Sequence, residues 1–399
     1  MIDGVKVNND VHLKPISLTN YVFLMNRLFL SLTAIFFSIS LIAQDNVTKS
    51  YEYFNEAVAF FKEKDFDTAV RYYTKAIELN ANYPKAYYNR ANCKLNLKEY
   101  ESAIKDFQMA IKYDEKFAKA HLYKGYAQMQ LKEYDSALVS FDDALDVDPK
   151  LAKAHLNKGT VLMKQKKYEP AIKSLTRSIS FDDGQATAYY NRGICQSRMK
   201  EYNEAIRDYG SAIEIKPSMT GAYVARGKAY LKAERFEEAI ADMTKAIKKK
   251  ANNADFYYYR GYAKLAIDDY NGANGDFAAA LEIEPKHKNA LINKALTSFN
   301  MKKYDDAAKE YGKLCGIFPD KALYHVNRGI AYLRLDEYNK AVSSFNHAID
   351  IDKKMPEAYF NRANAFSQLN KGDKACEDMR TAGKLGYDAA FGYIGDLCN

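Results

Sequence analysis

The chain has 399 residues, of which 48% are hydrophobic and 28% charged, and its formal net charge is +8. The only dense basic run is Lys248-Lys249-Lys250, so the clustered basic stripe of a nucleic-acid-binding protein is absent and no nucleic-acid partner is expected. The five cysteines and six histidines show no zinc-ligand spacing, and we expect neither a metal nor a cofactor.

The N-terminal region differs in composition from the rest of the chain. Residues 25–44 are typical of a signal peptide, because Arg27 precedes an apolar run from Leu28 to Ala43 and polar residues follow it. The run is short for a membrane span, which needs about 20 residues, although an uncleaved signal anchor is the alternative to cleavage. Met25 would begin a conventional signal. We therefore expect residues 1–24 to be disordered or to precede the true start, and residues 45–49 to form a short linker.

From Ser50 to Ala389, one pattern of 34 residues recurs ten times without insertion or deletion. In each repeat, position 8 is Gly or Ala, position 20 is Ala, and position 17 is aromatic in all repeats but the last. Apolar residues at helical spacing predict two helices per repeat, and the small residues allow their backbones to approach closely. The period predicts an all-α solenoid of stacked units. The repeats are 50–83, 84–117, 118–151, 152–185, 186–219, 220–253, 254–287, 288–321, 322–355 and 356–389.

The pattern resembles the tetratricopeptide repeat (TPR) family. It has an aromatic or His at position 4, a small residue at 8, Tyr at 17, Ala at 20, an aromatic at 24 and, in four repeats, Pro at 32. The family's Trp at position 4 is missing, because the chain has no Trp. The resemblance implies a right-handed superhelix whose concave surface is lined by the first helix of each repeat. The whole chain, including the stretch Lys374 to Asp378, resembles envelope TPR proteins of Gram-negative bacteria.

The C-terminal segment is expected to cover the last repeat. Residues 390–399 are predicted to form a capping helix, with Phe391, Ile394 and Leu397 at helical spacing. If that helix folds back, Cys376 and Cys398 meet and can form a disulfide. The interpretation that we favour is that all the cysteines are free thiols packed as small hydrophobic residues.

Position 6 offers a candidate peptide-binding row. Within the family this position faces the groove, and the row resembles the asparagine ladder inside the TPR superhelix of O-GlcNAc transferase. A primary amide both donates and accepts hydrogen bonds, so it can hold the backbone of an extended peptide. Equally, the row is explained by inheritance through repeat duplication. The residues are Asn55, Asn89, Asn157, Asn191, Asn293, Asn327 and Asn361.

Position 5 is apolar or aromatic, as in Tyr88, Tyr190 and Tyr258. The family resemblance implies that some of these residues line the groove wall, where they would form side-chain pockets. The alternative is ordinary packing between repeats. Because position 5 is never Lys, the clamp with which some TPR proteins hold the acidic C-terminus of cytosolic chaperones is not expected.

Position 7 is basic in nine repeats, and position 23 is acidic in six of them. This pattern predicts six ion pairs between the two helices of a repeat, such as Arg90 with Asp106. Lys124, Lys158 and Arg328 face Ser at position 23 and are expected to be free to meet a ligand. A candidate patch for an acidic ligand consists of Lys85, Lys119, Lys153, Lys124 and Lys158.

No catalytic set emerges, and we expect a protein that is not an enzyme. His121, His155 and His325 stand at the aromatic position 4 and are interpreted as packing residues. The sequence therefore predicts a scaffold in the periplasm or cell envelope of a Gram-negative-type bacterium, which binds a protein or extended peptide in its concave groove. It would touch a membrane only through an uncleaved signal anchor. The alternatives are a structural protein that self-assembles into homo-oligomers and a non-catalytic targeting subunit of an enzyme complex.

Overall fold

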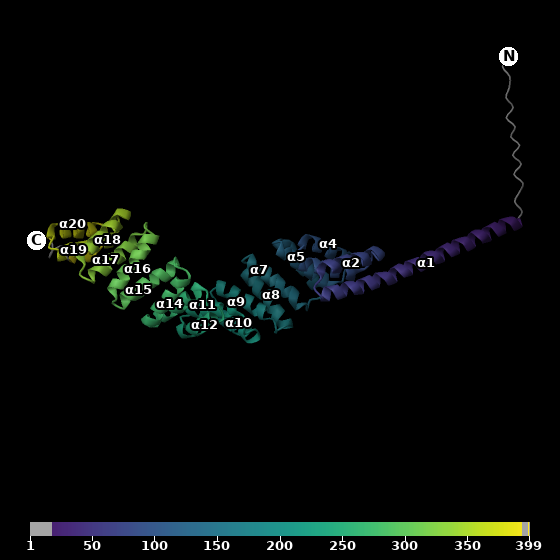
Figure 1. Cartoon of the computed structure of the whole chain (residues 1–399), viewed down its shortest axis with the longest axis horizontal. Coiled ribbons are helices and arrows are strands. Elements are labelled where there is room, and N and C mark those ends of the chain that lie inside the picture. The colour runs from purple at the N-terminus through teal and green to yellow at the C-terminus, as the bar shows by residue number, and fades with distance from the viewer. Residues whose placement is uncertain (1–17, 393–397, 399) are drawn as a thin grey trace, which may run out of the picture. The chain divides into compact units, whose positions relative to one another are not determined.

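The computed structural model describes residues 18–392 and 398 (Figure 1). Within these residues the chain forms twenty main helices and no strand, which confirms the all-α class. The helices are α1 (Leu18–Lys62), α2 (Phe66–Leu79), α3 (Pro84–Asn96), α4 (Tyr100–Tyr113), α5 (Ala118–Gln130), α6 (Tyr134–Val147), α7 (Ala152–Lys164), α8 (Tyr168–Phe181), α9 (Ala186–Arg198), α10 (Tyr202–Ile215), α11 (Thr220–Lys232), α12 (Phe236–Lys249), α13 (Ala254–Ala266), α14 (Tyr270–Ile283), α15 (Lys288–Asn300), α16 (Tyr304–Ile317), α17 (Ala322–Leu333), α18 (Tyr338–Ile351), α19 (Pro356–Gln368) and α20 (Gly372–Lys384).

Each predicted repeat contributes two of these helices. The chain divides into two compact units, Met1–Val161 and Leu162–Asn399, and the division falls inside α7. Within each unit the second helix of one repeat packs against the first helix of the next, as α4 does against α5 and α10 against α11. The expected solenoid of helix pairs is therefore present in both units.

Small residues bring the two helices of a repeat together. Ala137 is fully buried, and Phe141 fills the space beside it with no exposed surface. A Cβ atom on Gly125 would lie 2.7 Å from the Phe141 ring, so the backbone of α5 passes directly over that ring. The strict Gly or Ala at position 8 thus has a steric cause.

A tight turn joins the two helices of every repeat. Position 15 has a left-handed backbone each time, with φ between 55 and 66°, although it is never glycine. At the end of α3, for example, Lys98 has φ 63° and the amide of Glu99 donates to the carbonyl of Lys94 at 2.8 Å. This bond closes the C-terminus of the first helix in the manner of a Schellman motif.

Helix α1 continues from the N-terminal segment into the first repeat. Residues 18–24, which were expected either to be disordered or to precede the true start, are helical, whereas residues 1–17 lie outside the described part. The linker expected at 45–49 is also helical. Lys49 pairs with Asp45 at 2.8 Å, one helical turn away, and Thr48 Oγ1 donates to the carbonyl of Gln44 at 3.0 Å. These local contacts carry the helix across the expected break.

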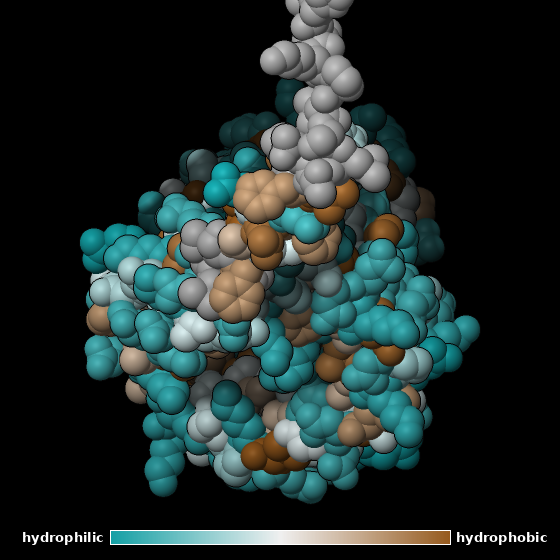
Figure 2. Space-filling view, turned by 90° about the vertical axis from the view of Figure 1, so that its right-hand side faces the viewer, coloured by the Kyte–Doolittle hydropathy of each residue, from teal (hydrophilic) through white to brown (hydrophobic). Residues whose placement is uncertain are grey.

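The surface of α1 differs from that of the helix pairs. Large hydrophobic side chains are exposed along its first part, among them Phe23, Phe29 and Phe37. Figure 2 shows brown hydrophobic residues within a face that is covered mostly by hydrophilic residues. Among the helices of the described residues, none contains a stretch long and apolar enough to cross a membrane.

The C-terminal end is attached to the last repeat by a covalent bond. Residues 389–392 form one helical turn, in which Ala390 is fully buried beside Ala363 and Met379, while the rest of the predicted cap, apart from residue 398, lies outside the described residues. Cys376 and Cys398 form a disulfide with a Cα–Cα distance of 5.2 Å. The expectation of five free thiols is therefore wrong for these two, because the chain folds back at Gly386, where φ is +92°.

Candidate functional site

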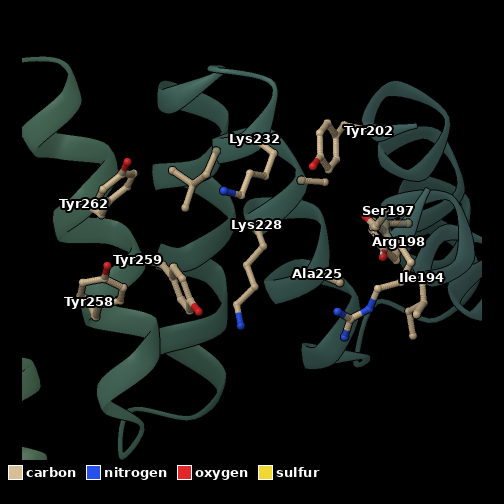
Figure 3. Close-up of a pocket in the computed structure, with 13 residues that line it drawn as sticks. Ile194, Ser197, Arg198, Tyr202, Ala225, Lys228, Lys232, Tyr258, Tyr259 and Tyr262 are labelled. Carbon is tan, nitrogen blue, oxygen red and sulfur yellow. Dashed lines mark hydrogen bonds between the residues drawn. The ribbon is translucent and has the colours of Figure 1, made fainter. Parts of the chain in front are cut away.

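The larger candidate site is a pocket of about 630 Å³ on the first helices of three consecutive repeats (Figure 3). Its rings and cations come from corresponding positions of α9, α11 and α13, mainly 5, 6, 9 and 13, with two tyrosines of α10 beside them. Residues at these positions face one side of the helices, whereas positions 4 and 8 face the core. The lining consists of Ile194, Ser197, Arg198, Tyr202, Tyr209, Ala225, Lys228, Ala229, Leu231, Lys232, Tyr258, Tyr259 and Tyr262.

Aromatic rings and cations meet in this pocket. The rings of Tyr258 and Tyr259 lie 5.1 Å apart, and the ammonium group of Lys228 lies 4.2 Å from the centre of the Tyr259 ring. Burial raises the pKa of Tyr209 to about 12 and raises the pKa of Tyr258, so both hydroxyls are protonated at neutral pH and can donate hydrogen bonds. The arrangement offers flat apolar surface with donors at its edge.

A second pocket, of about 420 Å³, lies on α1, α3 and α5. Its aromatic walls resemble those of the larger pocket, since Tyr88 packs against Tyr123 with ring centres 6.0 Å apart. Its polar groups are amides and tyrosine hydroxyls, however, and none of its lining residues is charged. The lining consists of Phe61, Tyr88, Asn92, Leu95, Asn96, Tyr123 and Tyr126.

The predicted tyrosines at position 5 take different places. Tyr88 and Tyr258 line the smaller and the larger pocket, respectively. Tyr190 does not line the larger pocket: its ring packs 5.8 Å from that of Tyr209, and burial raises its pKa. Position 5 thus lines a pocket at Tyr88 and Tyr258, whereas Tyr190 packs against Tyr209 of its own repeat and lies next to Gly221 of the following repeat. A role of these tyrosines in binding a peptide stays a prediction.

The predicted asparagine row is engaged largely within the protein. Asn89 and Asn327 form side-chain hydrogen bonds with the tyrosines at position 24 of the preceding repeats, Tyr73 and Tyr311. Asn293 bonds in the same way to Tyr258. These contacts join consecutive repeats and use part of the hydrogen-bonding capacity of each amide.

The other four asparagines vary in exposure. Asn191 is buried, with 7% of its surface exposed, Asn157 is half-buried, and Asn55 is exposed. Asn361 donates through Nδ2 to the carbonyl of Glu357 at 2.7 Å, within its own helix. None of the seven lines either pocket, and the position-6 residues that do line one are Tyr123, Ala225 and Tyr259. A role of the row in holding a peptide stays a prediction.

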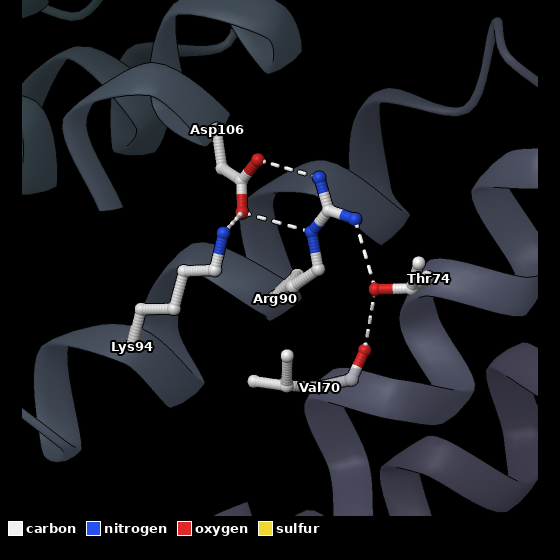
Figure 4. A network of polar contacts seen from close by, with 5 residues as sticks. All are labelled: Val70, Thr74, Arg90, Lys94 and Asp106. Atoms are coloured by element: carbon white, nitrogen blue, oxygen red, sulfur yellow. Dashed lines mark hydrogen bonds and ion pairs between the residues drawn. The ribbon is translucent and has the colours of Figure 1, made fainter. Parts of the chain in front are cut away.

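All six predicted ion pairs between positions 7 and 23 are present. Figure 4 shows the first, in which Arg90 Nε and Nη2 donate to the two oxygens of Asp106 at 2.9 and 2.7 Å. Lys94 adds a second cation to Asp106 at 2.7 Å, and Arg90 Nη1 reaches Thr74 of the preceding repeat at 3.0 Å. The pairs are Arg90–Asp106, Arg192–Asp208, Arg226–Asp242, Arg260–Asp276, Lys294–Glu310 and Arg362–Asp378.

Two of the three basic residues that were expected to be free are paired. Lys158 forms an ion pair with Asp142, and Lys124 lies 3.9 Å from Asp143. The expectation failed because carboxylates on the second helices replace the missing acid at position 23. Arg328 differs: within the described residues its Nε atom has no partner, and its Nη2 donates to the Tyr332 hydroxyl at 3.3 Å.

The rest of the predicted patch is exposed. Lys85, Lys119 and Lys153 stand at position 2 near the start of α3, α5 and α7, and none of them lines either pocket. Positions 2 and 7 point to different sides of a helix, so the geometry does not join these lysines to Lys124 and Lys158. Binding of an acidic ligand by this patch stays a prediction.

The histidines at position 4 pack in the core. His155 is 4% exposed, and its Nε2 lies 3.0 Å from the carbonyl oxygen of Pro149. His121 makes the corresponding contact with Glu115 at 3.4 Å. Among the described residues no group of His, Cys, Asp and Glu is arranged to hold a metal ion.

Sequence reasoning missed the residues that give the larger pocket its character. Lys228 and Tyr262 lie at position 9 and Lys232 at position 13, which vary from repeat to repeat, and Tyr259 lies at position 6, where seven other repeats have Asn. The feature of the sequence that could have identified these residues is their difference from the other repeats. Positions that pack must repeat, so varied large side chains on a first helix mark a surface that neighbouring repeats do not cover.

Family models support the repeat assignment. Models described as Tetratricopeptide repeat match residues 50–83, 84–117, 186–219, 124–186, 224–270 and 322–355. Four of these matches have the same bounds as the repeats predicted from the 34-residue period. No curated protein matches the chain.

Solved structures show a similar fold. The C-terminal part of a TPR repeat-containing protein from Cytophaga hutchinsonii is 21% identical, with a TM-score of 0.51, over 60% of this chain and 98% of that chain. YrrB, described as a TPR protein with an unusual peptide-binding site, is 21% identical, with a TM-score of 0.45, over 47% and 97%. MamA is 26% identical, with a TM-score of 0.39, over 43% and 94%.

Proposed function

Because the chain belongs to the tetratricopeptide repeat family, we propose that it is a scaffold that binds extended segments of partner proteins along the first helices of its repeats. Repeat proteins of this kind present long surfaces for binding, and catalysis is not part of the proposed role. The observation that carries the proposal is the pair of aromatic pockets, each built from corresponding positions of three first helices.

The chemistry of the pockets suits a peptide. Flat rings such as Tyr259 and Tyr126 offer apolar area to side chains, and tyrosine hydroxyls and asparagine amides offer hydrogen bonds to a peptide backbone. Successive first helices repeat these groups along the stack, so a segment without folded structure of its own can contact several repeats in turn.

We further propose that the scaffold acts in an oxidising compartment outside the cytoplasm, the periplasm or cell envelope. Two observations support this location. Residues 25–44 have the layout of a signal peptide, and Cys376 and Cys398 form a disulfide, a bond that persists in secreted and periplasmic proteins.

Crosslinking in living cells tests the proposed function. The native chain and a Tyr259→Ala/Tyr262→Ala variant are expressed in the source organism, crosslinked, and analysed by mass spectrometry for captured proteins. We expect the variant to lose partners that the native chain captures, while its thermal unfolding stays close to native because Tyr262 is 43% exposed. An unchanged set of partners would contradict the proposal. Capture of the chain by itself alone would favour the self-assembling alternative.

A further inference from the structure

We propose that the larger pocket selects an acidic partner segment, an extended peptide that carries several carboxylates beside aromatic or aliphatic side chains. This inference rests on the proposed function and narrows it to one chemical class of partner. The evidence is that positive charge is neutralised on one side of helices α9 and α11 and not on the other.

On the side that faces the second helices, positive charge is neutralised. Arg192 of α9 is held by Asp208 and Arg226 of α11 by Asp242, with N–O distances of 2.7 Å. Both carboxylates are buried, at 5% and 2% exposed. The pKa values of both arginines are raised by these hydrogen bonds, so the cations belong to the structure of the repeats.

On the side that lines the pocket, positive charge is not neutralised. Arg198 ends α9, and Lys228 and Lys232 lie one turn apart on α11. No lining residue is acidic, and across the described chain none of these three cations forms an ion pair. The pocket therefore has an unbalanced charge that a carboxylate would neutralise.

The aromatic wall holds one of these cations in place. Lys228 is half-buried, with its ammonium group over the Tyr259 ring, while Arg198 and Lys232 are exposed (Figure 3). A ring beneath the ammonium group leaves its other donors free for a carboxylate of the partner. The neighbouring rings of Tyr258 and Tyr262 offer area for an apolar side chain beside that carboxylate.

The smaller pocket provides an internal contrast. It has the same origin in three first helices, but its polar groups are the amides of Asn92 and Asn96 and the hydroxyls of its tyrosines, and none of them is charged. Amides bind a peptide backbone without preference for its charge. Of these two pockets, only the larger one thus has the charge to select acidic segments.

A peptide fits these observations better than a nucleic acid. A nucleic acid needs a basic stripe that follows its phosphates. Outside the pocket, Arg192 of α9 and Arg226 of α11 are already bound to aspartates. The cations of these helices that form no ion pair, Arg198, Lys228 and Lys232, line a pocket whose walls are tyrosine rings. A partner of mixed acidic and apolar side chains uses both components.

Fluorescence anisotropy with the full chain tests the inference. One labelled probe is an extended peptide of alternating glutamate and phenylalanine; the other has glutamine in place of each glutamate. We expect the acidic probe to bind more tightly. We also expect Lys228→Gln to weaken it roughly tenfold, as for a lost charge-assisted hydrogen bond, and to leave the glutamine probe unchanged. Lys173→Gln, an exposed lysine on α8 outside the pocket, serves as the matched control.

Other outcomes would overturn the inference in distinguishable ways. Equal binding of both probes, with no effect of Lys228→Gln, would refute the charge selection while leaving peptide binding in place. Binding of neither probe would refute the acidic class, and the crosslinking experiment would then decide the proposed function separately. An oligonucleotide that competes with the acidic probe at equal concentration, in a manner that depends on Lys228, would identify a general polyanion site instead.

Discussion

Arg226 and Asp242 join α11 to α12 through two parallel hydrogen bonds, from Nε to Oδ2 at 2.7 Å and from Nη2 to Oδ1 at 2.9 Å. The same fork recurs in four other repeats, sixteen residues apart each time. These pairs fix the angle between the two helices of a repeat, and the first helix in turn positions its pocket residues. On α11 the anchor Arg226 and the pocket residue Lys228 are two residues apart.

Loss of the carboxylate should be costly. In Asp242→Asn, the half-buried Arg226 keeps its charge and loses its buried anionic partner, so we expect the free energy of unfolding to fall by about 3 kcal/mol. Urea denaturation followed by circular dichroism measures the change. An apolar double variant, Arg226→Met/Asp242→Leu, should recover most of that loss, because no unpaired charge remains. If Asp242→Asn had the same free energy of unfolding as the native chain, this account would be contradicted.

A carboxylate introduced beside Arg328 should stabilise the protein. Its two partner positions are Ser344 and Gly312, and its Nε atom is buried without an acceptor in the described part of the chain. We expect Ser344→Asp to recreate the fork and to raise the free energy of unfolding by about 1 kcal/mol. Ser140→Asp, beside Lys124, is the control and should gain less, because Lys124 already lies 3.9 Å from the carboxylate of Asp143. If the two substitutions raised the free energy of unfolding equally, the missing acceptor at Arg328 Nε would not be the cause of the gain.

The left-handed turns can be relaxed by glycine. Lys132 has φ 63°, a conformation that costs a residue with a Cβ atom about 1–2 kcal/mol. After allowance for the greater freedom of glycine in the unfolded chain, we expect Lys132→Gly to stabilise the protein by about 0.5–1 kcal/mol. Asn370→Gly should gain less, since asparagine tolerates this conformation. The melting temperatures of the two variants check the order, and a loss of stability in Lys132→Gly would refute it.

His325 should make repeat nine sensitive to acid. Burial lowers its pKa below 6.5, and the nearby His347 and Arg328 lower it further. Because the folded state resists protonation, this stability is present above the unfolded pKa and is lost as the pH falls through the folded pKa. We expect the melting temperature to drop between about pH 7 and pH 5, and His325→Tyr to reduce that drop by about 2 °C. An identical pH profile for the variant would rule out His325 as the cause.

The cysteines should divide into two chemical groups. Burial raises the pKa of Cys93 to about 12 and of Cys195 to about 11, and it also raises the pKa of Cys315. These three thiols should resist iodoacetamide in the native state and react in denaturant, whereas Cys376 and Cys398 should react only after reduction. Mass spectrometry of the alkylated chain counts the labels. Labelling of Cys376 without reductant would show that the C-terminal segment is not held by the disulfide.

The helix pairs could be predicted from the sequence because packing repeats. Ala137 and its equivalents must be small wherever two backbones meet, so their recurrence every 34 residues gave the helices and their partners. The forks followed for the same reason: positions 7 and 23 have a fixed separation, and the charges at Arg90 and Asp106 are complementary.

The site could not be predicted in the same way. A pocket depends on which side chains remain uncovered. Lys228 occupies a position without a consensus, and Tyr259 stands where seven other repeats have Asn. The recurrence of Asn at position 6 suggested a peptide-binding row. In the structure, several of these asparagines contact a neighbouring repeat instead, as Asn89 does with Tyr73. The linker before Ser50 was misjudged because polar residues such as Asp45 and Lys49 stabilise a helix when they lie one turn apart.

The most direct test of peptide binding at the larger pocket is photocrosslinking from defined positions in the source organism. The photoreactive residue p-benzoylphenylalanine replaces Tyr262, which lines the pocket, or Val139, which is 61% exposed on the second helix α6 and serves as the control. We predict covalent adducts with a partner protein from the Tyr262 position and none from the Val139 position. Adducts from Val139 with none from Tyr262 would place partner binding on the second helices and contradict the account.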